Sequence, residues 1–261
     1  MALNDKDFGE NIEFSVKKKF GIISLNRLHR SNAFTIEFLK DLEKVVKLCQ
    51  DNHRIKGIIL TNEGTSFSTG MDIGAIATYN YEQVKELENT AANICKLLYN
   101  GKPVIGAING RTLGEGVVFL VCCDYRIATR ESFFQMPEIN TAIFPGTGCI
   151  ILFSKIIGIP WTKKMLMFAE KVASSKALEI GLIDCIVETR EELMLKAIDK
   201  ALFLQPKNQT VINSIKIFSN HLLNLPFIEA YELEKKGSDW YTYEDKEKLL
   251  KELRDYFDWK T

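Results

Sequence analysis

Short apolar runs of strand length alternate with amphipathic helical patterns through the first two thirds of the chain. Residues 56–61 and 103–108 are apolar and bounded by turn residues, as buried strands are. Between them, residues 35–49 and 81–99 repeat apolar side chains at three- and four-residue steps, the period of an α-helix. This alternation predicts an α/β fold in which strands and helices are wound around one core.

The same rhythm continues on both sides of these segments. Residues 12–16 and 21–25 are β-rich and are separated by three lysines, which indicates a hairpin with a solvated turn. Further along the chain we expect a buried helix at residues 113–122, strands at 124–129 and 132–135, and a helix at 146–157.

The pattern changes near Arg190. Residues 191–204, 208–223 and 244–256 all have helical periodicity, and no strong strand pattern remains. We therefore expect a core domain at residues 1–190 and a helical C-terminal region at residues 191–261 that serves oligomerisation, although the pattern equally allows these helices to fold back on their own core.

Charge and cysteine usage exclude several functions. The 34 basic and 34 acidic residues cancel, so no net field favours nucleic acid. The six cysteines form no C-x-x-C pair, which argues against a zinc site or a disulfide framework. The N-terminus lacks the pattern of a signal peptide, and no apolar run is long enough to span a membrane. We expect a cytoplasmic protein.

The first segment that suggests chemistry is a loop of small residues, residues 65–74, between a buried strand and a helix. Where such a loop enters a helix, backbone N–H groups lack intrahelical acceptors and a ligand can approach them. An ordinary surface turn is the alternative.

A second loop joins the strand at 103–108 to a glycine-flanked helix start. The spacing of Gly110, Gly114 and Gly116 also imitates a dinucleotide-binding fingerprint, and Tyr231 and Lys235 have the spacing of a dehydrogenase Tyr-x-x-x-Lys pair. Against a dehydrogenase, these glycines lie in the middle of the chain and no strand follows Tyr231 to complete a doubly wound sheet.

The third segment, residues 132–148, contains a single carboxylate among large apolar side chains. Glu138 is flanked in sequence by Phe133, Phe134, Met136 and, further on, Phe144. Burial there would favour the neutral carboxyl and strengthen the ionised form as a base. Alternatively, Glu138 caps a strand or points to solvent after Pro137.

Together these segments resemble the crotonase (enoyl-CoA hydratase/isomerase) family in order and approximate spacing over residues 12–190. The matching motifs lie at residues 25–27, 31–33, 67–72, 107–110, 114–116, 123–124, 137–138, 144–148 and 181–187. The resemblance implies a superhelix of repeated ββα units, homotrimers or hexamers formed through C-terminal helices, and an acyl-CoA substrate, with no metal or other cofactor.

Carried over by position, the resemblance assigns an oxyanion hole to the backbone N–H groups of Met71 and Glu115, and the catalytic carboxylate to Glu138. It places Arg27 near the nucleotide end of CoA. The other substrate-binding residues that we expect are Gly70, Met71, Asp72, Ile73, Gly74, Gly114, Val118 and Phe144.

Two positions depart from the family's pattern. Glu115 replaces a common glycine, and its side chain either crowds the tunnel or supplies a second acid-base group. Val118 stands where the hydratases have the first of their two glutamates. The resemblance therefore favours a 3-enoyl-CoA to 2-enoyl-CoA isomerase that uses Glu138 alone. Hydration with Glu115 as the second acid, thioester hydrolysis, decarboxylation and a non-catalytic acyl-CoA-binding subunit remain alternatives.

Overall fold

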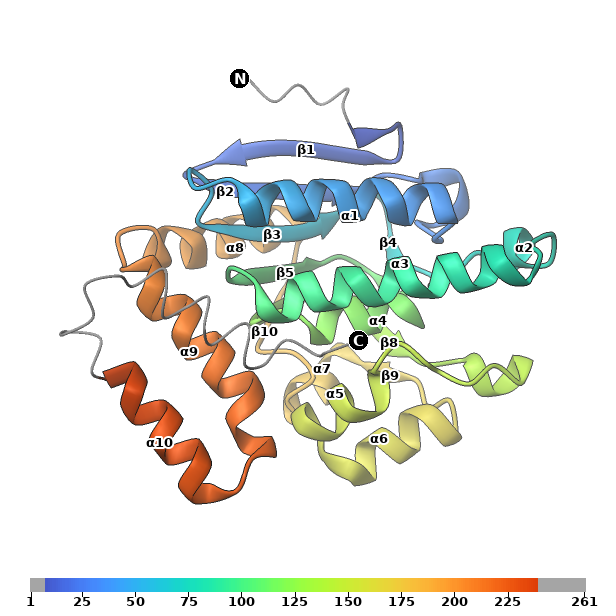
Figure 1. Cartoon of the computed structure of the whole chain (residues 1–261). Helices are drawn as coiled ribbons and strands as arrows, with labels where there is room; N and C mark the ends of the chain where they lie inside the picture. Colours follow the sequence, from blue (N-terminus) through green and yellow to red (C-terminus); the bar gives the residue numbers. More distant parts are fainter. Residues whose placement is uncertain (1–7, 239–261) are drawn as a thin grey trace.

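The computed structural model of the protein describes residues 8–238 (Figure 1). The helix expected at residues 244–256 lies outside the described residues. A six-stranded sheet, in the order β1-β2-β3-β5-β7-β10, forms the centre. Its strands are β1 (Ile12–Lys17), β2 (Phe20–Leu25), β3 (Gly57–Asn62), β5 (Val104–Ile108), β7 (Tyr125–Thr129) and β10 (Cys185–Val187).

Only the first pair in this sheet is antiparallel. β1 and β2 form the predicted hairpin, and Lys18 and Lys19 take the positive φ values of 53° and 64° that a tight two-residue turn requires. The other neighbouring strands are parallel. A second sheet, in the order β4-β6-β8-β9, contains β4 (Ser66–Ser68), β6 (Arg111–Leu113), β8 (Phe133–Gln135) and β9 (Val172–Ala173).

Successive units of the chain repeat one connection. A strand of the large sheet leads to a strand of the small sheet and then to a helix, as in β3-β4-α3, β5-β6-α4 and β7-β8-α5. The helices of the first four units are α1 (Ile36–Asp51), α2 (Ile73–Ile76), α3 (Tyr81–Asn100), α4 (Glu115–Val121) and α5 (Cys149–Ile156). This arrangement confirms the predicted superhelix of ββα units.

The later helices follow on from this core. They are α6 (Gly158–Met167), α7 (Ser174–Glu179), α8 (Arg190–Leu204), α9 (Gln209–His221) and α10 (Phe227–Ser238). We did not predict α6, α7 or α10. In α6, Pro160 lies in the first turn, where its missing N–H removes no hydrogen bond, so it does not interrupt the helix.

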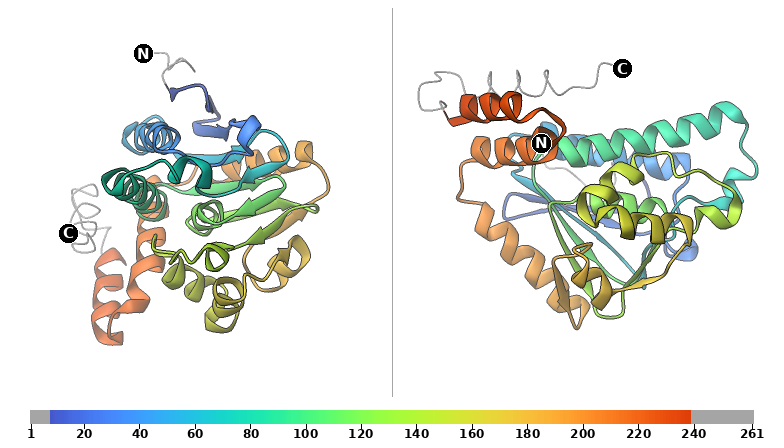
Figure 2. Two further views of the ribbon diagram at one scale, coloured as in Figure 1. Left: turned by 90° about the vertical axis from the view of Figure 1, so that its right-hand side faces the viewer. Right: turned by 90° about the horizontal axis from the view of Figure 1, so that it is seen from below.

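Alternate residues of the large sheet contact different helices. Ile58 and Leu60 of β3 belong to the core cluster that includes α1, α3 and α4, whereas Ile59 packs with Leu193 and Ala197 of α8. Neighbouring strand residues point to opposite faces, so the sheet needs a helical cover on both. α4 is buried along its whole length near the centre of the molecule (Figure 2, left).

The helix α8, which follows the predicted boundary at residue 190, therefore covers one face of the core sheet. α9 contacts α3, and both α9 and α10 lie outside the sheet (Figures 1 and 2). Assembly through the C-terminal region stays a prediction. Within residues 8–238, no helix is both long and apolar enough to cross a membrane.

The predicted start of one helix was wrong. We expected a single buried helix over residues 113–122, but β6 runs to Leu113, which pairs with Gln135, and α4 begins at Glu115. Gly114 separates them with φ 53° and ψ −127°, a conformation that side chains disfavour. The apolar pattern of the sequence does not reveal this break because a strand of three residues is too short to show a period.

Candidate active site

The two glycine-bearing loops meet in the structure. A Cβ added to Gly70, whose φ is +79°, would lie 3.0 Å from the carbonyl oxygen of Leu113 and 3.3 Å from the backbone nitrogen of Glu115. Glycine at residue 70 thus lets the loop after β4 contact the first turn of α4. The predicted convergence of the loops is confirmed.

The loops leave two backbone N–H groups available at this contact. Phe34 N donates to Gly70 O at 2.8 Å and Asp72 N donates to Phe34 O at 2.9 Å, so in this parallel bridge the N–H of Met71 points away from Phe34. Glu115 is the first residue of α4, where an N–H has no intrahelical acceptor. Met71 and Glu115 both line one cavity.

This cavity has a volume of about 370 Å³ and is formed by the loop after β4, α3, α4 and the segment between β8 and α5. Most of the predicted site residues line it. They are Gly70, Met71, Ile73, Gly114, Glu115, Val118, Glu138 and Phe144.

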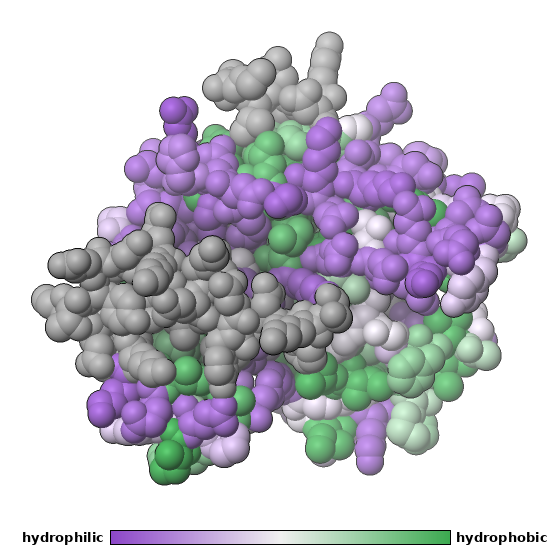
Figure 3. All heavy atoms as spheres, in the orientation of Figure 1, coloured by the Kyte–Doolittle hydropathy of each residue, from purple (hydrophilic) through white to green (hydrophobic). Residues whose placement is uncertain are grey.

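Exposed apolar side chains lie beside the cavity. Ile143 and Phe144 line it while remaining 42% and 75% exposed. Ile139, Ile150 and Ile159 are also exposed on the same part of the chain. Figure 3 shows hydrophobic side chains gathered at its lower right, over the region of α5 and α6. An apolar surface next to the cavity suits a ligand with a hydrocarbon portion.

Glu138 presents its carboxyl to the cavity. It begins a short 3-10 helix (Glu138–Thr141), and its Oε2 is buried without a hydrogen-bond partner among the described residues. A Cβ on Gly114 would lie 2.7 Å from Oε1 of Glu138. Burial raises the pKa of the Glu138 carboxyl, in the direction that the sequence predicted. The alternative of a solvent-facing glutamate was wrong.

The side chain of Glu115 is buried in the same region. The Thr147 hydroxyl donates to Glu115 Oε2 at 2.7 Å, and the Cys95 thiol donates to Oε1 at 3.7 Å. Burial raises the pKa of Glu115 to about 7, although both hydrogen bonds oppose the shift, and the charge of Glu138 raises it further. Glu115 therefore titrates near neutrality next to a second carboxyl.

The ionisable side chains among the described residues that line this cavity are all glutamates, so any charge they carry is negative. Glu88 of α3 joins Glu115 and Glu138, and the described lining residues include no lysine, arginine or histidine. A ligand part that carries its own carboxylate would be repelled here, whereas an uncharged acyl group would not.

Val118 is 1% exposed and lines the cavity one turn after Glu115 on α4. Residues three apart on a helix share a face, so Glu115 and Val118 present their side chains to the same side of the helix. The carboxyl that the sequence lacks at residue 118 is thus present one helical turn earlier.

Three predicted substrate-binding residues do not line the cavity. The Arg27 Nη1 atom donates to Asp72 Oδ2 at 2.7 Å and to Ala33 O at 3.0 Å. Asp72 also accepts from Ala75 N and so caps α2. Burial opposes ionisation of Asp72, but the bonds from Arg27 and Ala75 outweigh it and lower the pKa. Gly74 is exposed in α2, and contacts of these residues with substrate stay predictions.

The glycines of the dinucleotide-like motif are used for packing. A Cβ on Gly110 would lie 2.0 Å from Thr65 O, and one on Gly116 would lie 3.0 Å from Ser68 Cβ. These glycines allow the two loops to pack against each other, so the space that a bound phosphate would need is filled by protein atoms. Tyr231 lies on α10 and is 54% exposed. The dehydrogenase alternative is therefore unsupported.

Sequence reasoning did not identify Thr147 or Cys95 as parts of the site. Thr147 lies inside the motif at residues 144–148, which gave a weak signal. Cys95 is one buried position among the apolar residues of α3, and nothing in its local pattern distinguishes it.

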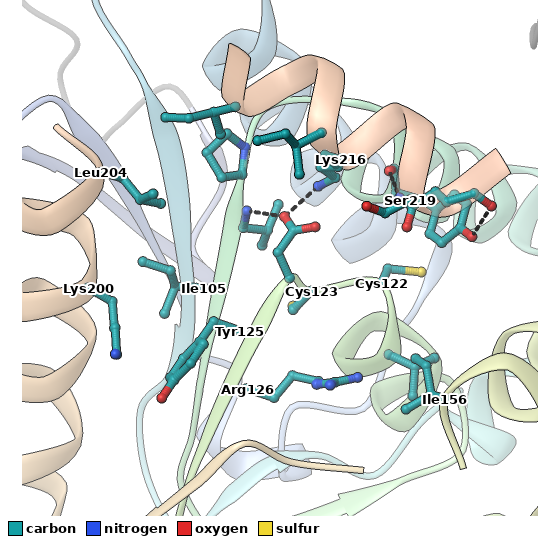
Figure 4. Close-up of a pocket in the computed structure, with 18 of the residues that line it drawn as sticks. Ile105, Cys122, Cys123, Tyr125, Arg126, Ile156, Lys200, Leu204, Lys216 and Ser219 are labelled. Atoms are coloured by element: carbon teal, nitrogen blue, oxygen red, sulfur yellow. Dashed lines mark hydrogen bonds and ion pairs between the residues drawn. The ribbon is translucent and has the colours of Figure 1, made fainter. Parts of the chain in front are cut away.

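A larger cavity of about 620 Å³ lies between the large sheet, α8 and α9 (Figure 4). Lys216 of α9 points into the core there, and its Nζ bonds Asp124 Oδ2 at 2.7 Å, Leu98 O at 2.5 Å and Lys102 O at 3.1 Å. Lys200 enters from α8 and lies over the Tyr125 ring. None of the predicted site residues lines this cavity.

This fold, with its paired glycine loops and acidic cavity, is that of a known enzyme class. The enoyl-CoA hydratase/isomerase family profile matches residues 16–259, and the chain belongs to this family. It is an enzyme family, and the resemblance noted from the motifs is confirmed.

Individual relatives support this. The chain is 31% identical to Bacillus subtilis YngF, which is named as an enoyl-CoA hydratase/isomerase, over 88% of this chain and 89% of that protein. It is 28% identical to the crotonyl-CoA hydratase of Syntrophomonas wolfei, over 86% and 87%. The crystal structure of an enoyl-CoA hydratase from Bacillus anthracis has the same fold, with a TM-score of 0.85 and 24% identity over 95% of this chain and 97% of that one.

Proposed function

We propose that this protein binds an acyl-CoA thioester and moves a double bond from the 3-position to the 2-position. The observation that supports this most directly is the Glu138 carboxyl, which is buried, has an unpaired oxygen among the described residues and lies against Gly114 at the start of α4. A base at this point can reach a carbon next to a carbonyl held by the adjacent amides.

The proposed reaction begins with the thioester oxygen between the N–H groups of Met71 and Glu115. Ionised Glu138 takes a proton from C2, and the C–H electron pair becomes a dienolate with its negative charge on the thioester oxygen. The protonated Glu138 then returns the proton to C4. The electrons collapse to form the C2–C3 double bond, and the carboxylate is regenerated.

The apolar residue at 118 favours isomerisation over hydration. Water addition in the family uses two glutamates, as the resemblance implies, whereas a double-bond shift needs one carboxyl. Val118 lines the cavity, and its side chain has no polar atom.

Hydration is the second candidate, and one observation favours it. The Glu115 carboxyl lines the same cavity as Glu138, so two acids are available to hold a water molecule. The names of relatives such as the crotonyl-CoA hydratase agree with this candidate. Decarboxylation of an acyl group that carries its own carboxylate is disfavoured because no cation lines the described part of the cavity.

A substrate panel on the purified protein separates these activities. We expect turnover of 3-hexenoyl-CoA to exceed hydration of crotonyl-CoA, and Glu138→Gln to reduce it at least 100-fold. Glu131→Gln, at an exposed position before β8, is the matched control and should leave turnover unchanged. Near-normal turnover by Glu138→Gln would reject the mechanism. Tight acyl-CoA binding without turnover of any thioester would instead support the non-catalytic subunit.

The proposal also includes the setting of the enzyme. We expect a cytoplasmic homotrimer or hexamer assembled through the C-terminal helices and working without metal or cofactor. Light scattering of the full chain tests the assembly. Turnover that persists after exhaustive treatment with a chelator would support activity without a metal.

A further inference from the structure

One residue, Glu115, contributes two groups to the cavity. Its backbone N–H lies at the contact with Gly70, and its carboxyl lines the same space as Glu138. The residue as a whole is only 6% exposed. Little solvent screens this carboxyl. Its charge therefore interacts strongly with a ligand that is bound at the backbone N–H groups.

Three elements hold the carboxyl in place. α4 supplies Glu115 itself, α3 supplies the Cys95 thiol, and the segment before α5 supplies the Thr147 hydroxyl at 2.7 Å. The hydrogen bond from Thr147 is shorter than the bond from Cys95, and a hydroxyl is a stronger donor than a thiol. A hydroxyl that donates to a carboxyl oxygen stabilises the ionised form of the carboxyl.

The groups that face Glu115 do not compensate a negative charge. Glu138 lies in the same cavity and raises the pKa of Glu115. Glu88 of α3 lines the cavity as well. The thiols of Cys95 and Cys149 are held protonated by raised pKa values. No cationic side chain lines the described part of the cavity.

We propose that the Glu115 carboxyl must carry its proton for the enolate to form, so that Glu138, Glu115 and the substrate together hold a single negative charge, and that Thr147 sets the pH at which this proton is lost. The inference rests on the proposed function. Proton removal by Glu138 transfers its charge to the thioester oxygen, and an ionised Glu115 next to that oxygen would oppose the transfer.

The consequence is a limit on the alkaline side of the pH profile. Glu138 must be ionised to act and Glu115 must be neutral, so activity requires the pair to hold one proton. Because Glu115 has a pKa of about 7, wild-type turnover should decline above neutrality.

Two substitutions test the inference by the shape of the profile. In Glu115→Gln, normalised to its own maximum, the decline near pH 7 should disappear, because glutamine is neutral at every pH. In Thr147→Val, loss of the donated hydrogen bond should move the decline to higher pH, and Thr147→Ser should restore it. A decline that stays at the same pH in both Glu115→Gln and Thr147→Val would overturn the inference.

A second measurement needs no turnover. Infrared difference spectra of the ligand-free protein should show a protonated carboxyl band that disappears on titration through about pH 7 and is missing from Glu115→Gln. If that band is present but no enoyl-CoA is turned over, the proposed function fails while the protonation of Glu115 stands. If isomerisation occurs and the band is absent at pH 6, the inference about Glu115 fails while the proposed function stands.

Discussion

Gly114 and Glu138 are packed so closely that a Cβ on Gly114 would lie 2.7 Å from Oε1 of Glu138. Gly114 also has a positive φ of 53°. The residue before the proposed oxyanion-hole amide is thus constrained twice, by its backbone conformation and by the carboxyl of Glu138.

Gly114→Ala should therefore reduce kcat/KM for 3-enoyl-CoA by about 100-fold, because a displacement of about 1 Å of the reacting groups costs that much. The matched control is Gly146→Ala. Gly146 lines the same cavity, but an added Cβ would find its nearest neighbour, Phe144 O, at 3.9 Å. Equal effects of the two substitutions would show that the contact with Glu138 is unimportant.

Burial of Glu115 makes folding stability depend on pH. Its folded pKa of about 7 lies above the ordinary value of 4.5, so the folded carboxyl keeps its proton where the unfolded one has lost it. The free energy of unfolding consequently falls as the pH rises from about 4.5 to 7, and the loss is complete above 7.

Glu115→Gln removes this dependence. From 1.36 kcal/mol per pKa unit, we expect the stability of the variant relative to wild type to increase by roughly 2–3 kcal/mol between pH 5 and pH 8. Urea unfolding of both proteins at the two pH values measures the change. A stability difference that is independent of pH would contradict the burial of this carboxyl.

Lys216 anchors α9 to the core. Its side chain is 4% exposed and bonds Asp124, which is 33% exposed, together with two backbone carbonyls. Lys216→Met should lower the free energy of unfolding by about 2–3 kcal/mol, near the low end for a broken buried pair, because Asp124 keeps some contact with water. Lys163→Met, at an exposed position on α6, should change it by less than about 0.5 kcal/mol. Denaturant unfolding decides between these outcomes.

The ion pair between Arg27 and Asp72 supports the loop that carries Met71. The two side chains are 14% and 11% exposed, and Asp72 caps α2 directly after Met71. Arg27→Met should cost about 2–3 kcal/mol of stability and reduce kcat/KM, because it frees this loop. Arg54→Met, at an exposed position after α1, is the control. Unchanged thermal unfolding of Arg27→Met would argue against this role.

The residue at 118 gives a test of isomerase against hydratase. The double variant Glu115→Gly, Val118→Glu restores the glycine and the first glutamate that the resemblance assigns to hydratases. We expect it to gain at least tenfold in crotonyl-CoA hydration relative to its isomerisation of 3-hexenoyl-CoA. Glu115→Gly alone is the control, and an equal gain in this single variant would show that residue 118 does not select the reaction.

Much of the fold was predictable from local pattern. The 3.6-residue period placed α1 and α3, and the apolar runs placed β3 and β5 to within one or two residues. The start of α4 was mistaken because β6 is a three-residue strand, too short to show a period. α10 was missed because its apolar face is weakly patterned and remains partly exposed.

The candidate site was predicted in part. Gly70, Gly114 and Glu138 lie together as their motifs indicated, because loops at the ends of adjacent parallel strands meet at one edge of a sheet. The direction of the Glu115 side chain was not predictable, since it depends on Cys95 of α3 and on Thr147.

The amino-acid sequence by itself determined the type and order of the elements and the positions that require glycine, because periodicity and backbone φ are local properties of a chain. Only the tertiary structure decided that Glu115 is buried beside a second acid, that Arg27 pairs with Asp72, and that Lys216 reaches Asp124. Burial and charge pairing arise between segments distant in sequence, and they set the protonation states on which the proposed chemistry depends.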